Sequence, residues 1–546
     1  MNKLISILLG LLIFTSFSKL FAQNTLGTIT YSEGTYEGYT LFTSMTETYL
    51  INNCGEVINQ WTSSFNPGNA VYLLEDGSLL RACKTEDTSI NFGGTGGRIE
   101  KYNWEGVLTW SFNYSAENYR QHHDIYPMPN GNVLMLTVDV LTEETAIQLG
   151  RNPEEIIDGE IYNEMIIELE PTGINSANIV WEWSFKDHLI QDFDATKENY
   201  GVVSENPQLL DFNFLGNLSG INNWLHVNSI QYNENFDQIV LSSRHLNEIY
   251  IIDHSTTTAE ASSHLGGNSN KGGDFLYRWG NPQSYNQGTA EDQILFGQHY
   301  PHWIDEGLTD QGKLILFNNG FGRSPSYSEI FVIDTPVDEN GNYTYEPDSA
   351  YGPVDPFHTY TNPSDPVNFF SRILSSAQRL PNGNTLICDG DSGYFFEINE
   401  NHETVWEYIN PSSSNGILTE GDDPHEFPNM VFRAVKYSPD YAAFENINLT
   451  PGNPIELDFE SVDCSQLSIP DHSVSDVVIY PNPTSNVINI SAISTIDKIE
   501  LFNSLGQRLL VTNSTQQISI SKFKPGFYFI KVYASNGSKT FKVIKE

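Results

Sequence analysis

Six segments with strand character, each ending in an aromatic residue, recur through most of the chain. They end at Trp61, Trp110, Trp183, Trp279, Tyr360 and Tyr408. Most are followed by a loop and then by two apolar runs joined by a turn, from "HHDIYPMPNGNVLML" in an early unit to "FRAVKYSPDYAAF" in the sixth. Short apolar runs around Gly- and Asn-containing turns are typical of antiparallel strands. Because repetition of such units around an axis protects sheet edges, the pattern predicts an all-β chain with a six-bladed β-propeller.

The alternative to a propeller is an irregular β-sandwich or a pair of stacked domains. One weakly helical stretch, "TEETAIQLGRNPEEIID" at residues 142–158, interrupts the β pattern and predicts an excursion from the sheets. We assign residues 23–445 to the propeller.

The two ends of the chain differ from this repeat. Residues 1–22 carry a lysine, an apolar run and a small residue at Ala22, the layout of a cleavable secretory signal peptide. No later apolar stretch is long enough for a membrane span, so an exported, soluble protein is expected. Residues 446–475, rich in Pro, Asp and Ser, are predicted to be a linker. Residues 476–546 contain short β-runs with closely spaced turns, which predict a small β-sandwich.

The chain is strongly acidic, with a formal charge of −42 from 69 acidic and 27 basic residues. This charge argues against nucleic acid or an anionic membrane surface as a partner. Four cysteines, Cys54, Cys83, Cys388 and Cys464, have no spacing typical of a zinc site, and we expect disulfides or buried thiols.

Three histidines take equivalent places when the repeats are aligned by their turns. His122, His226 and His302 each lie six residues before the residue that precedes the turn. The first strand of each propeller blade lines the central channel, so these imidazoles are expected to converge near one mouth of it. Asp124 and Asn228 follow at the second position after two of them.

Converging histidines have three interpretations. They can be hydrogen-bonded structural residues, metal ligands together with Asp124, or an anion-binding and acid–base site. His299, close to His302, and Arg323, on the strand after the same turn, favour the third. A guanidinium presents a planar fork that suits tetrahedral oxyanions, although a single arginine can equally be an exposed partner of a carboxylate.

The ordered set of motifs resembles the arylsulfate sulfotransferase family of bacterial β-propellers. The motifs are "RQHHDIYPMPNGNVLML", "WLHVNSIQYN", "IVLSSR", "LYRWGNPQSY", "LFGQHYPHWI", "LILFNNGFGR", "FFSRILSSAQRLPNGNTLICDGDSGYFFEI" and "VWEYINP". The resemblance implies a six-bladed propeller that uses a phenolic sulfate ester as donor and a phenol as acceptor. In that family a histidine takes the sulfuryl group, while other histidines and an arginine hold its oxygens.

The family motifs assign roles to particular residues of this chain. His226, His302 and Arg323 are expected to be catalytic, and His122, His123, Asn228 and His299 are expected to bind substrate. The family draws a further histidine from a later blade, where this chain has Leu374, Ser375 and Ser376. His358 and His425, in loops nearby in sequence, are candidates to substitute for it.

The tail resembles the type IX secretion C-terminal sorting domain of Bacteroidetes through "YPNPTSN", "NSLGQ", "PGFYFIKV" and "KVIKE". This implies a type IX secretion machinery as partner and a final location outside the cell or on its surface. No metal is expected in the site and no cofactor, apart from a structural calcium ion. "DENGN" (338–342) and "DGDSG" (389–393) loosely resemble calcium loops, but ordinary turns explain them as well.

Two functions follow from these residues. The first is an exported enzyme that transfers a sulfuryl group between phenolic compounds. The second is a noncatalytic surface propeller that binds an anionic ligand, such as a sulfated glycan or peptide, in the same basic channel. The missing histidine around residues 374–376 is the feature that supports the second function.

Overall fold

The structure is a computed structural model that describes residues 24–216, 221–459, 478–491, 496–503, 508–513, 517–534 and 537–545. It divides into two compact units, Met1–Ser461 and Val462–Glu546, which are described separately. The predicted signal peptide lies outside the described residues, as do residues 460–475 of the predicted linker.

The described residues of the first unit form six antiparallel sheets of four or five strands. The first three, in the order in which their strands pair, are β30 (Ala434–Tyr437), β2 (Tyr39–Ser44), β3 (Glu47–Ile51), β4 (Val57–Thr62); β5 (Pro67–Leu73), β6 (Leu79–Lys84), β7 (Gly97–Tyr102), β8 (Leu108–Asn113); and β9 (Ser115–Ala116), β10 (Tyr119–Pro127), β11 (Val133–Thr142), β12 (Glu160–Pro171), β13 (Ala177–Ser184). The other three are β16 (Val227–Asn233), β17 (Gln238–Ser243), β18 (Glu248–Asp253), β19 (Tyr277–Trp279); β20 (His299–Trp303), β21 (Leu314–Asn318), β22 (Glu329–Ile333), β23 (His358–Tyr360); and β24 (Ser376–Arg379), β25 (Thr385–Asp389), β26 (Tyr394–Ile398), β27 (Thr404–Ile409), β1 (Gly27–Tyr31).

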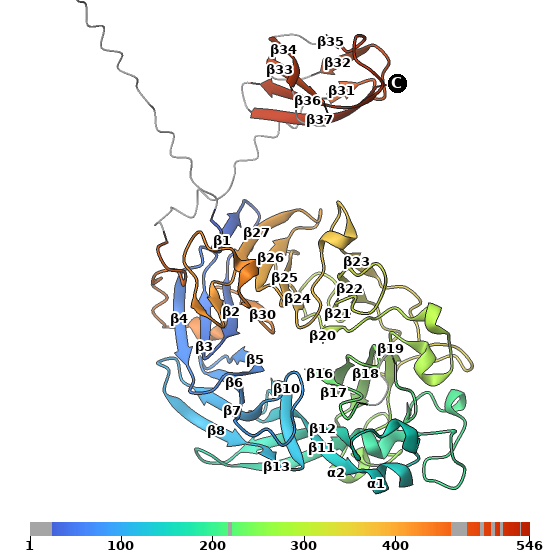
Figure 1. Ribbon diagram of the computed structural model, residues 1–546. Coiled ribbons are helices and arrows are strands. Elements are labelled where there is room, and N and C mark those ends of the chain that lie inside the picture. Colours follow the sequence, from blue (N-terminus) through green and yellow to red (C-terminus); the bar gives the residue numbers. More distant parts are fainter. Residues whose placement is uncertain are drawn as a thin grey trace, which may run out of the picture. The chain divides into compact units, whose positions relative to one another are not determined.

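The inner strands of these sheets form a ring of neighbours. β5 contacts β2 and β10, β16 contacts β10 and β20, and β24 contacts β20 and β30. Figure 1 shows the sheets arranged around a common centre, with these strands nearest to it. The chain is therefore all-β with a propeller-like arrangement of its first unit.

The two ends of the first unit close the ring. β30, from the C-terminal side, pairs with β2, from the N-terminal side, for example Phe42 with Ala434. The sequence predicted a sixth hairpin within "FRAVKYSPDYAAF", and this prediction is wrong for its second strand. Residues Ala442–Phe444 form a 3-10 helix, because β30 already has its partner in β2.

The recurring tryptophans lie in outer strands and tie each sheet to the next. The side chains of Trp61, Trp183, Trp279 and Trp406 are almost fully buried. Each indole N–H donates to a backbone carbonyl in a loop of the neighbouring sheet, as from Trp61 to Asn103 (2.9 Å) and from Trp183 to Gly273 (2.8 Å). Trp406 closes the circle by donating to Asn53 (2.8 Å) of the first sheet. A buried indole N–H needs such a partner. The tryptophans therefore recur in the sequence because the same contact between neighbouring sheets recurs in the structure.

Helices are short and lie in the connections. The stretch predicted to be helical contains α1 (Glu143–Gln148), whose N-cap Thr142 accepts from the Thr145 N–H, and a 3-10 helix. The remaining elements are α2 (Thr258–Ala261), the 3-10 helices Pro153–Glu155, Phe185–His188, Val203–Glu205, Pro282–Tyr285, Ala290–Asp292, Pro366–Asn368 and Pro424–Glu426, and the strand pairs β14 (Leu189–Ile190) with β15 (Leu210–Asp211) and β28 (Ser412–Ser413) with β29 (Gly416–Ile417).

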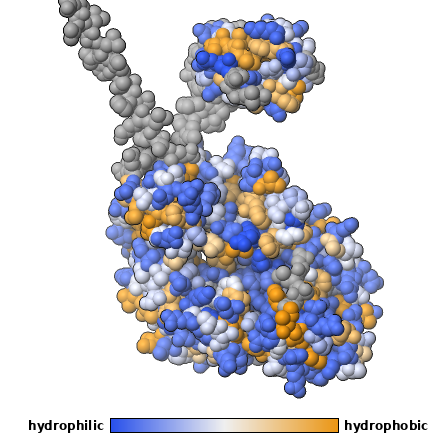
Figure 2. Space-filling model, in the orientation of Figure 1, coloured by the Kyte–Doolittle hydropathy of each residue, from blue (hydrophilic) through white to orange (hydrophobic). Residues whose placement is uncertain are grey.

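The first unit continues past residue 445. The Gly452 N–H donates to the Val57 carbonyl (2.8 Å), and Ile455 packs into a core cluster with residues of β2, β3 and β25 to β27. The face of the molecule seen in Figure 2 is mostly hydrophilic with small scattered hydrophobic areas, as the acidic composition predicts.

The second unit consists of two antiparallel sheets that share one core. The sheets are β31 (Val478–Tyr480), β32 (Val487–Ser491), β35 (Gln517–Ser519); and β34 (Arg508–Asn513), β33 (Ile496–Asn503), β36 (Gly526–Ala534), β37 (Gly537–Lys545). Ile488 and Ile518 of the first sheet pack with Ile499, Ile530 and Val543 of the second.

Two further features concern the cysteines and the helices. Cys54 is disulfide-bonded, whereas Cys83 and Cys388 are buried free thiols, so the nearest cysteines in sequence, Cys54 and Cys83, do not pair. Within the described part of the chain, every helix is too short or too polar to cross a membrane.

Candidate functional site

Irregularities in three neighbouring inner strands bring histidines together. The pairing register shifts between Gln121 and Ile125 in β10, between Val227 and Ser229 in β16, and between His299 and His302 in β20. At or beside these irregularities His123, His226 and Tyr300 have positive φ values of 47°, 47° and 53°. A non-glycine residue in this region is strained, and such strain is concentrated at functional sites. The bulges re-aim the side chains that precede each regular strand.

Four imidazoles form a continuous cluster. The rings of His123 and His226 meet edge to face with centroids 4.6 Å apart, and the His245 ring stacks on His226 at 4.5 Å. His122 Nδ1 lies 2.9 Å from His123 Nδ1. Phe92 packs against His122, His123 and His226.

His302 is not the equivalent of His122 and His226, and that predicted alignment is wrong. The turn after β20 is longer than assumed: the Ile304 N–H bonds to the Lys313 carbonyl, so Leu308 lies inside the turn. His302 instead stacks on Tyr300 at 4.3 Å, and its Nδ1–H donates to the Tyr300 carbonyl (3.2 Å).

Arg244, directly after β17, supplies the positive charge of the cluster. It lies close enough to lower the pKa values of His123, His226, His245 and His299, in each case after the larger effect of burial. Burial and the charge of Arg372 also lower the pKa of Arg244. Among the described residues no carboxylate forms an ion pair with Arg244, and its guanidinium instead faces the Phe321 ring at 5.1 Å. An unpaired guanidinium in a chain of charge −42 is suited to an anionic ligand.

The histidines around Arg244 are neutral near pH 7. Burial, with the charge of Arg244 second, lowers the pKa of His245 to about 4 and that of His299 to about 3. Burial and the neighbouring imidazoles hold the pKa values of His123 and His226 well below the ordinary value. Neutral imidazoles keep a nitrogen lone pair for proton transfer or nucleophilic attack.

Hydrogen bonds fix the tautomers of two of these rings. His245 Nδ1 lies 2.9 Å from the Asn223 carbonyl and His299 Nδ1 lies 2.7 Å from Asn319 Oδ1. The Asn319 amide nitrogen donates to the Ser371 and Leu374 carbonyls, so its oxygen must face His299. Because oxygens only accept here, both rings carry the proton on Nδ1 and the lone pair on Nε2.

Asn223 also contacts His226. Its side-chain nitrogen lies 2.7 Å from His226 Nδ1, while its Oδ1 is buried without a hydrogen-bond partner among the described residues. Turning this amide over would give Oδ1 a partner in the His226 Nδ1–H and would put the lone pair of His226 on Nε2.

The carboxylate of Glu164 contacts the histidine cluster on the side away from the pocket. Glu164 Oε2 lies 2.8 Å from His122 Nε2 without straight hydrogen-bond geometry, and its Oε1 accepts from the Val227 N–H (3.0 Å). His122 is fully buried. It therefore supports His123 and does not itself line the open pocket.

A polar network joins the inner strands beside the histidines. Arg433, next to β30, donates to Asp124 Oδ2 (2.7 Å) and to the Tyr72 hydroxyl (2.8 Å), and its guanidinium lies 3.6 Å from the Tyr300 ring centre. Burial alone would lower the pKa of Arg433, but Asp124 raises it above the ordinary value. Asp124 is thus held by an arginine and the Ile230 N–H, so it is not grouped with the histidines as a metal ligand in the described chain.

The cluster opens into a pocket of about 400 Å³. The residues that line it are Asn91, Phe92, Gly93, Tyr162, Ile221, Asn222, Asn223, His226 and His245. Two aromatic walls and several amides face the histidines, and the lining contains no carboxylate. Gly94, in the loop over the cluster, has φ +88°, and a Cβ there would lie 2.1 Å from His123 Nε2. Only glycine leaves room for that ring.

The other predicted site residues lie outside this lining. The Asn228 amide is buried and donates to the Gln298 carbonyl (2.8 Å), beside His299. Arg323 pairs with Glu329 (2.7 Å) and donates to the Tyr327 carbonyl (2.6 Å). Phe321, in the same loop as Arg323, packs against the guanidinium of Arg244. Arg323 is therefore linked to the histidines only through Phe321 and Arg244.

No histidine replaces the one expected from the sixth sheet, within the described residues. Leu374 and Ser375 occupy the left-handed positions before β24, and the Ser375 hydroxyl bonds to Ser371. His358 lies exposed on the outermost strand of its sheet and His425 in an exposed 3-10 helix, so neither substitutes for it.

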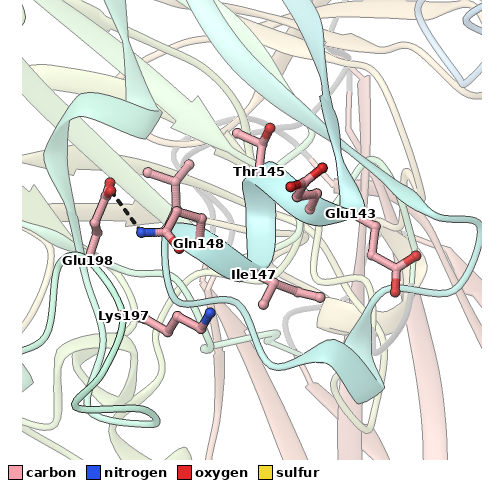
Figure 3. Close-up of a pocket in the computed structure, with 8 residues that line it drawn as sticks. Glu143, Thr145, Ile147, Gln148, Lys197 and Glu198 are labelled. Atoms are coloured by element: carbon pink, nitrogen blue, oxygen red, sulfur yellow. Dashed lines mark hydrogen bonds between the residues drawn. The ribbon is translucent and has the colours of Figure 1, made fainter.

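A larger hollow of about 820 Å³ lies beside α1 (Figure 3). Its charged residues are Glu143, Glu144, Glu198 and Lys197, and Gln148 donates to Glu198 (3.0 Å). Its lining includes no histidine or cysteine among the described residues, and its excess of carboxylates does not suit an anion. We therefore place the candidate site at the smaller histidine pocket.

Three important residues were missed from the sequence. Arg244 and His245 follow "IVLSS" directly, at the end of a predicted strand, so their position at a strand end was a usable signal. Glu164 lies in the middle of β12 with no local motif around it, and only the paired strands bring it to His122.

Two sequence families match this chain. The family described as Arylsulfotransferase (ASST) matches residues 23–423, and the one described as Secretion system C-terminal sorting domain matches residues 478–546. A curated arylsulfate sulfotransferase from Lelliottia amnigena is 28% identical over 288 residues, which cover 48% of this chain and 46% of that protein. The chain thus matches about half the length of this curated relative.

Solved structures resemble the chain weakly. A protein of unknown function from Bacteroides caccae is 10% identical, with a TM-score of 0.38 and coverage of 73% of this chain and 98% of that one. A periplasmic gluconolactonase from Pseudomonas aeruginosa is 11% identical, with a TM-score of 0.33 and coverage of 68% and 96%. These scores are too low to add to the description of the fold.

Proposed function

Since the chain belongs to the arylsulfotransferase family, we propose that it is an enzyme that transfers a sulfuryl group from a phenolic sulfate ester to a phenol. The reaction takes place in the histidine pocket of a six-bladed β-propeller, and the second unit is a small β-sandwich. The type IX sorting domain directs the protein to the cell surface or the outside.

The observation that carries the proposal is the charge balance of the pocket. Arg244 has no carboxylate partner in the described chain, it lies close enough to lower the pKa values of His123, His226, His245 and His299, and the described residues of the pocket lining include no acidic residue. A sulfate ester is a monoanion, so one guanidinium can neutralise it without a metal ion. Preorganised donors of this kind stabilise charge that develops during group transfer.

His245 is the best-placed nucleophile. Its Nδ1–H is held by the Asn223 carbonyl, so the Nε2 lone pair is free, and burial keeps the ring neutral to about pH 4. In the first step His245 Nε2 bonds to the sulfur of the donor and the bond from sulfur to the phenolic oxygen breaks. The phenolate departs, while Arg244 holds the oxygens of the sulfuryl group.

His226 is the acid–base group of the second step. When Asn223 presents its oxygen to His226 Nδ1, the Nε2 lone pair can take the proton of the acceptor phenol. The phenol oxygen bonds to sulfur, the bond from sulfur to His245 breaks, and the proton passes from His226 to solvent. Phe92 and Tyr162 provide aromatic walls for the phenol rings.

The other sequence candidates have supporting roles in this proposal. Glu164, His122 and His123 hold the His226 ring from one side, and Arg433 with Tyr300 and His302 forms the neighbouring network. Asn228 and His299 anchor the bulge of β20 beside Arg244, and Arg323 holds the loop that carries Phe321.

The assay uses the purified full-length protein, p-nitrophenyl sulfate as donor and phenol as acceptor. Release of nitrophenolate that requires the acceptor, and that falls roughly 10²–10³-fold in Arg244→Ala, supports sulfuryl transfer. Release that does not depend on the acceptor indicates a sulfatase, and no release with the folded protein contradicts the proposal.

The second candidate function is noncatalytic binding of an anionic ligand in the same pocket. It is favoured by Leu374 and Ser375, which stand where the family supplies a further histidine. Binding of p-nitrophenyl sulfate that is lost in Arg244→Ala, without any turnover, would support this function over the enzyme.

A further inference from the structure

Two histidines and an aspartate meet outside the histidine pocket. His188 ends the 3-10 helix after β13, while His264 and Asp274 lie in the long connection between β18 and β19. His188 Nδ1 is 2.8 Å and His264 Nδ1 is 2.7 Å from the same oxygen, Asp274 Oδ1. The three atoms lie within 4.8 Å of one another.

The hydrogen-bond partners of His188 point to a cation at this place. His188 Nε2 lies 2.8 Å from the Ala261 carbonyl, which can only accept, so Nε2 carries the ring proton. The other ring nitrogen, Nδ1, then faces Asp274 Oδ1 at 2.8 Å. The cation between these two atoms is either a second ring proton or a metal ion, and the nearby His264 nitrogen adds a further ligand that suits the metal ion. A histidine that donates its second nitrogen to a backbone carbonyl is the usual arrangement of a metal ligand.

The surroundings hold His188 rigidly. Its side chain is fully buried, and the Trp183 ring stacks on it at 5.4 Å with an interplanar angle of 5°. Gly273 packs so closely that a Cβ there would lie 2.5 Å from His188 Nε2. The side chain of Asp274 is also buried, with 7% exposure.

His264 is the solvent-exposed residue of the three. The side chain of His264 is 59% exposed, so an ion can enter and a water molecule can complete its coordination. Lys271 is the other charged group nearby: burial lowers its pKa, and the attraction of Asp274 opposes this effect. Lys271 competes with a bound cation for Asp274, which weakens cation binding. The two imidazole ligands are unaffected by this competition.

We propose that His188, His264 and Asp274 bind a divalent transition-metal ion, with zinc as the best match. Two imidazole nitrogens, one carboxylate oxygen and a water suit tetrahedral zinc, whose ligand distances are about 2.0–2.2 Å. The ion joins the connection between β18 and β19 to the 3-10 helix that follows β13, and so links two neighbouring sheets. The sequence did not predict this group, because His188 is far in the chain from His264 and Asp274 and the three residues match no short metal-binding motif.

The test uses the full-length protein after removal of metal with EDTA. Calorimetric titration with zinc chloride and thermal unfolding with and without zinc are measured for the unchanged protein, His264→Ala, Asp274→Asn and His358→Ala. His358 is the matched control, because its side chain is 60% exposed and also lies near an aspartate. Calcium chloride serves as the control ion, since it prefers oxygen ligands.

We expect zinc to raise the melting temperature of the unchanged protein and of His358→Ala, and one equivalent of binding to be lost in His264→Ala and Asp274→Asn. His264→Ala without metal should melt like the unchanged protein, because His264 is exposed. Zinc binding that persists unchanged in His264→Ala would assign the ion to other histidines and overturn the proposal, as would the absence of any zinc binding. The outcome is independent of sulfuryl transfer, because no residue of this group lines the histidine pocket.

Discussion

His245 donates its Nδ1–H to the backbone carbonyl of Asn223 at 2.9 Å, and the side chain of the same Asn223 lies 2.7 Å from His226 Nδ1. One residue therefore sets the orientation of both imidazoles that line the pocket. This arrangement separates their roles: His245 has a fixed lone pair on Nε2, while the lone pair of His226 depends on which end of the amide it meets.

Substitution of Asn223 should separate these two roles. In Asn223→Asp the carboxylate accepts the His226 Nδ1–H and raises the pKa of His226, so activity persists with its acid limb shifted to higher pH. In Asn223→Leu, His226 loses its partner while the backbone carbonyl to His245 remains, and kcat should fall on the order of tenfold or more. Equal loss in both variants, with unchanged melting temperatures, would contradict the assignment of His226 as base.

Arg244 and Arg323 should behave differently. Arg244 has no ion-pair partner in the described chain, so Arg244→Lys, which loses the planar fork, should lower kcat/KM at least tenfold with little change in stability. Arg323 is held by Glu329, so Arg323→Lys should act mainly on stability, by about 1 kcal/mol. Kinetics and urea unfolding of the two variants distinguish these outcomes. A larger loss of activity in Arg323→Lys would return the anion-binding role to Arg323.

Gly94→Ala should damage the site through the His123 ring. A Cβ at Gly94 would lie 2.1 Å from His123 Nε2, and the positive φ of 88° adds strain. The matched control is Gly131→Ala, where φ is +90° but a Cβ would have nothing within 4 Å. The control should lose about 1 kcal/mol of stability and keep its activity, whereas Gly94→Ala should lose more stability and most of its activity. Similar behaviour of the two variants would show that His123 has room to move.

The neutral histidines predict a stability that falls with acid. The folded pKa values of His245 and His299, about 4 and about 3, lie below the unfolded value of about 6.5. The unfolded chain therefore binds these protons first, and the free energy of unfolding should decrease as the pH falls from about 6.5 toward 4. Melting temperatures measured across this range check the prediction, and His245→Gln should reduce the slope.

His254 predicts the opposite behaviour in alkali. Burial lowers its pKa, but Asp237 and Glu168, at 2.7 and 3.0 Å, outweigh burial and raise the pKa to about 9. The contribution of the charged ring is complete below about pH 6.5 and should be lost as the pH rises through 9. Thermal unfolding from pH 6 to 10 should show this loss in the unchanged protein and not in His254→Gln.

The sequence predicted the features that repeat and missed those that depend on closure. The tryptophans at strand ends marked the outer strands because each buried indole must find a carbonyl in the next sheet. The failure at "FRAVKYSPDYAAF" came from the joining of chain ends: β30 pairs with β2, far away in sequence. No local pattern carries that information.

The candidate site was predicted in part for a similar reason. Bulges change the number of residues between a turn and the site, so aligning His302 by its turn misplaced it. His226, also expected from the sequence, lies in the lining of the candidate pocket, and its role stays a prediction. Glu164 supports His122 across paired strands and the Asn223 carbonyl holds His245, two contacts that strand periodicity does not predict.

The most direct test of the account is to trap the covalent intermediate. The protein is mixed with p-nitrophenyl sulfate without acceptor, quenched at alkaline pH, and digested for mass spectrometry of the peptides that contain His226 and His245. We predict one sulfuryl group on His245, formed together with a stoichiometric burst of nitrophenolate, lost on addition of phenol and absent in His245→Ala. Turnover with phenol that proceeds undiminished in His245→Ala, without a sulfurylated histidine, would contradict the account.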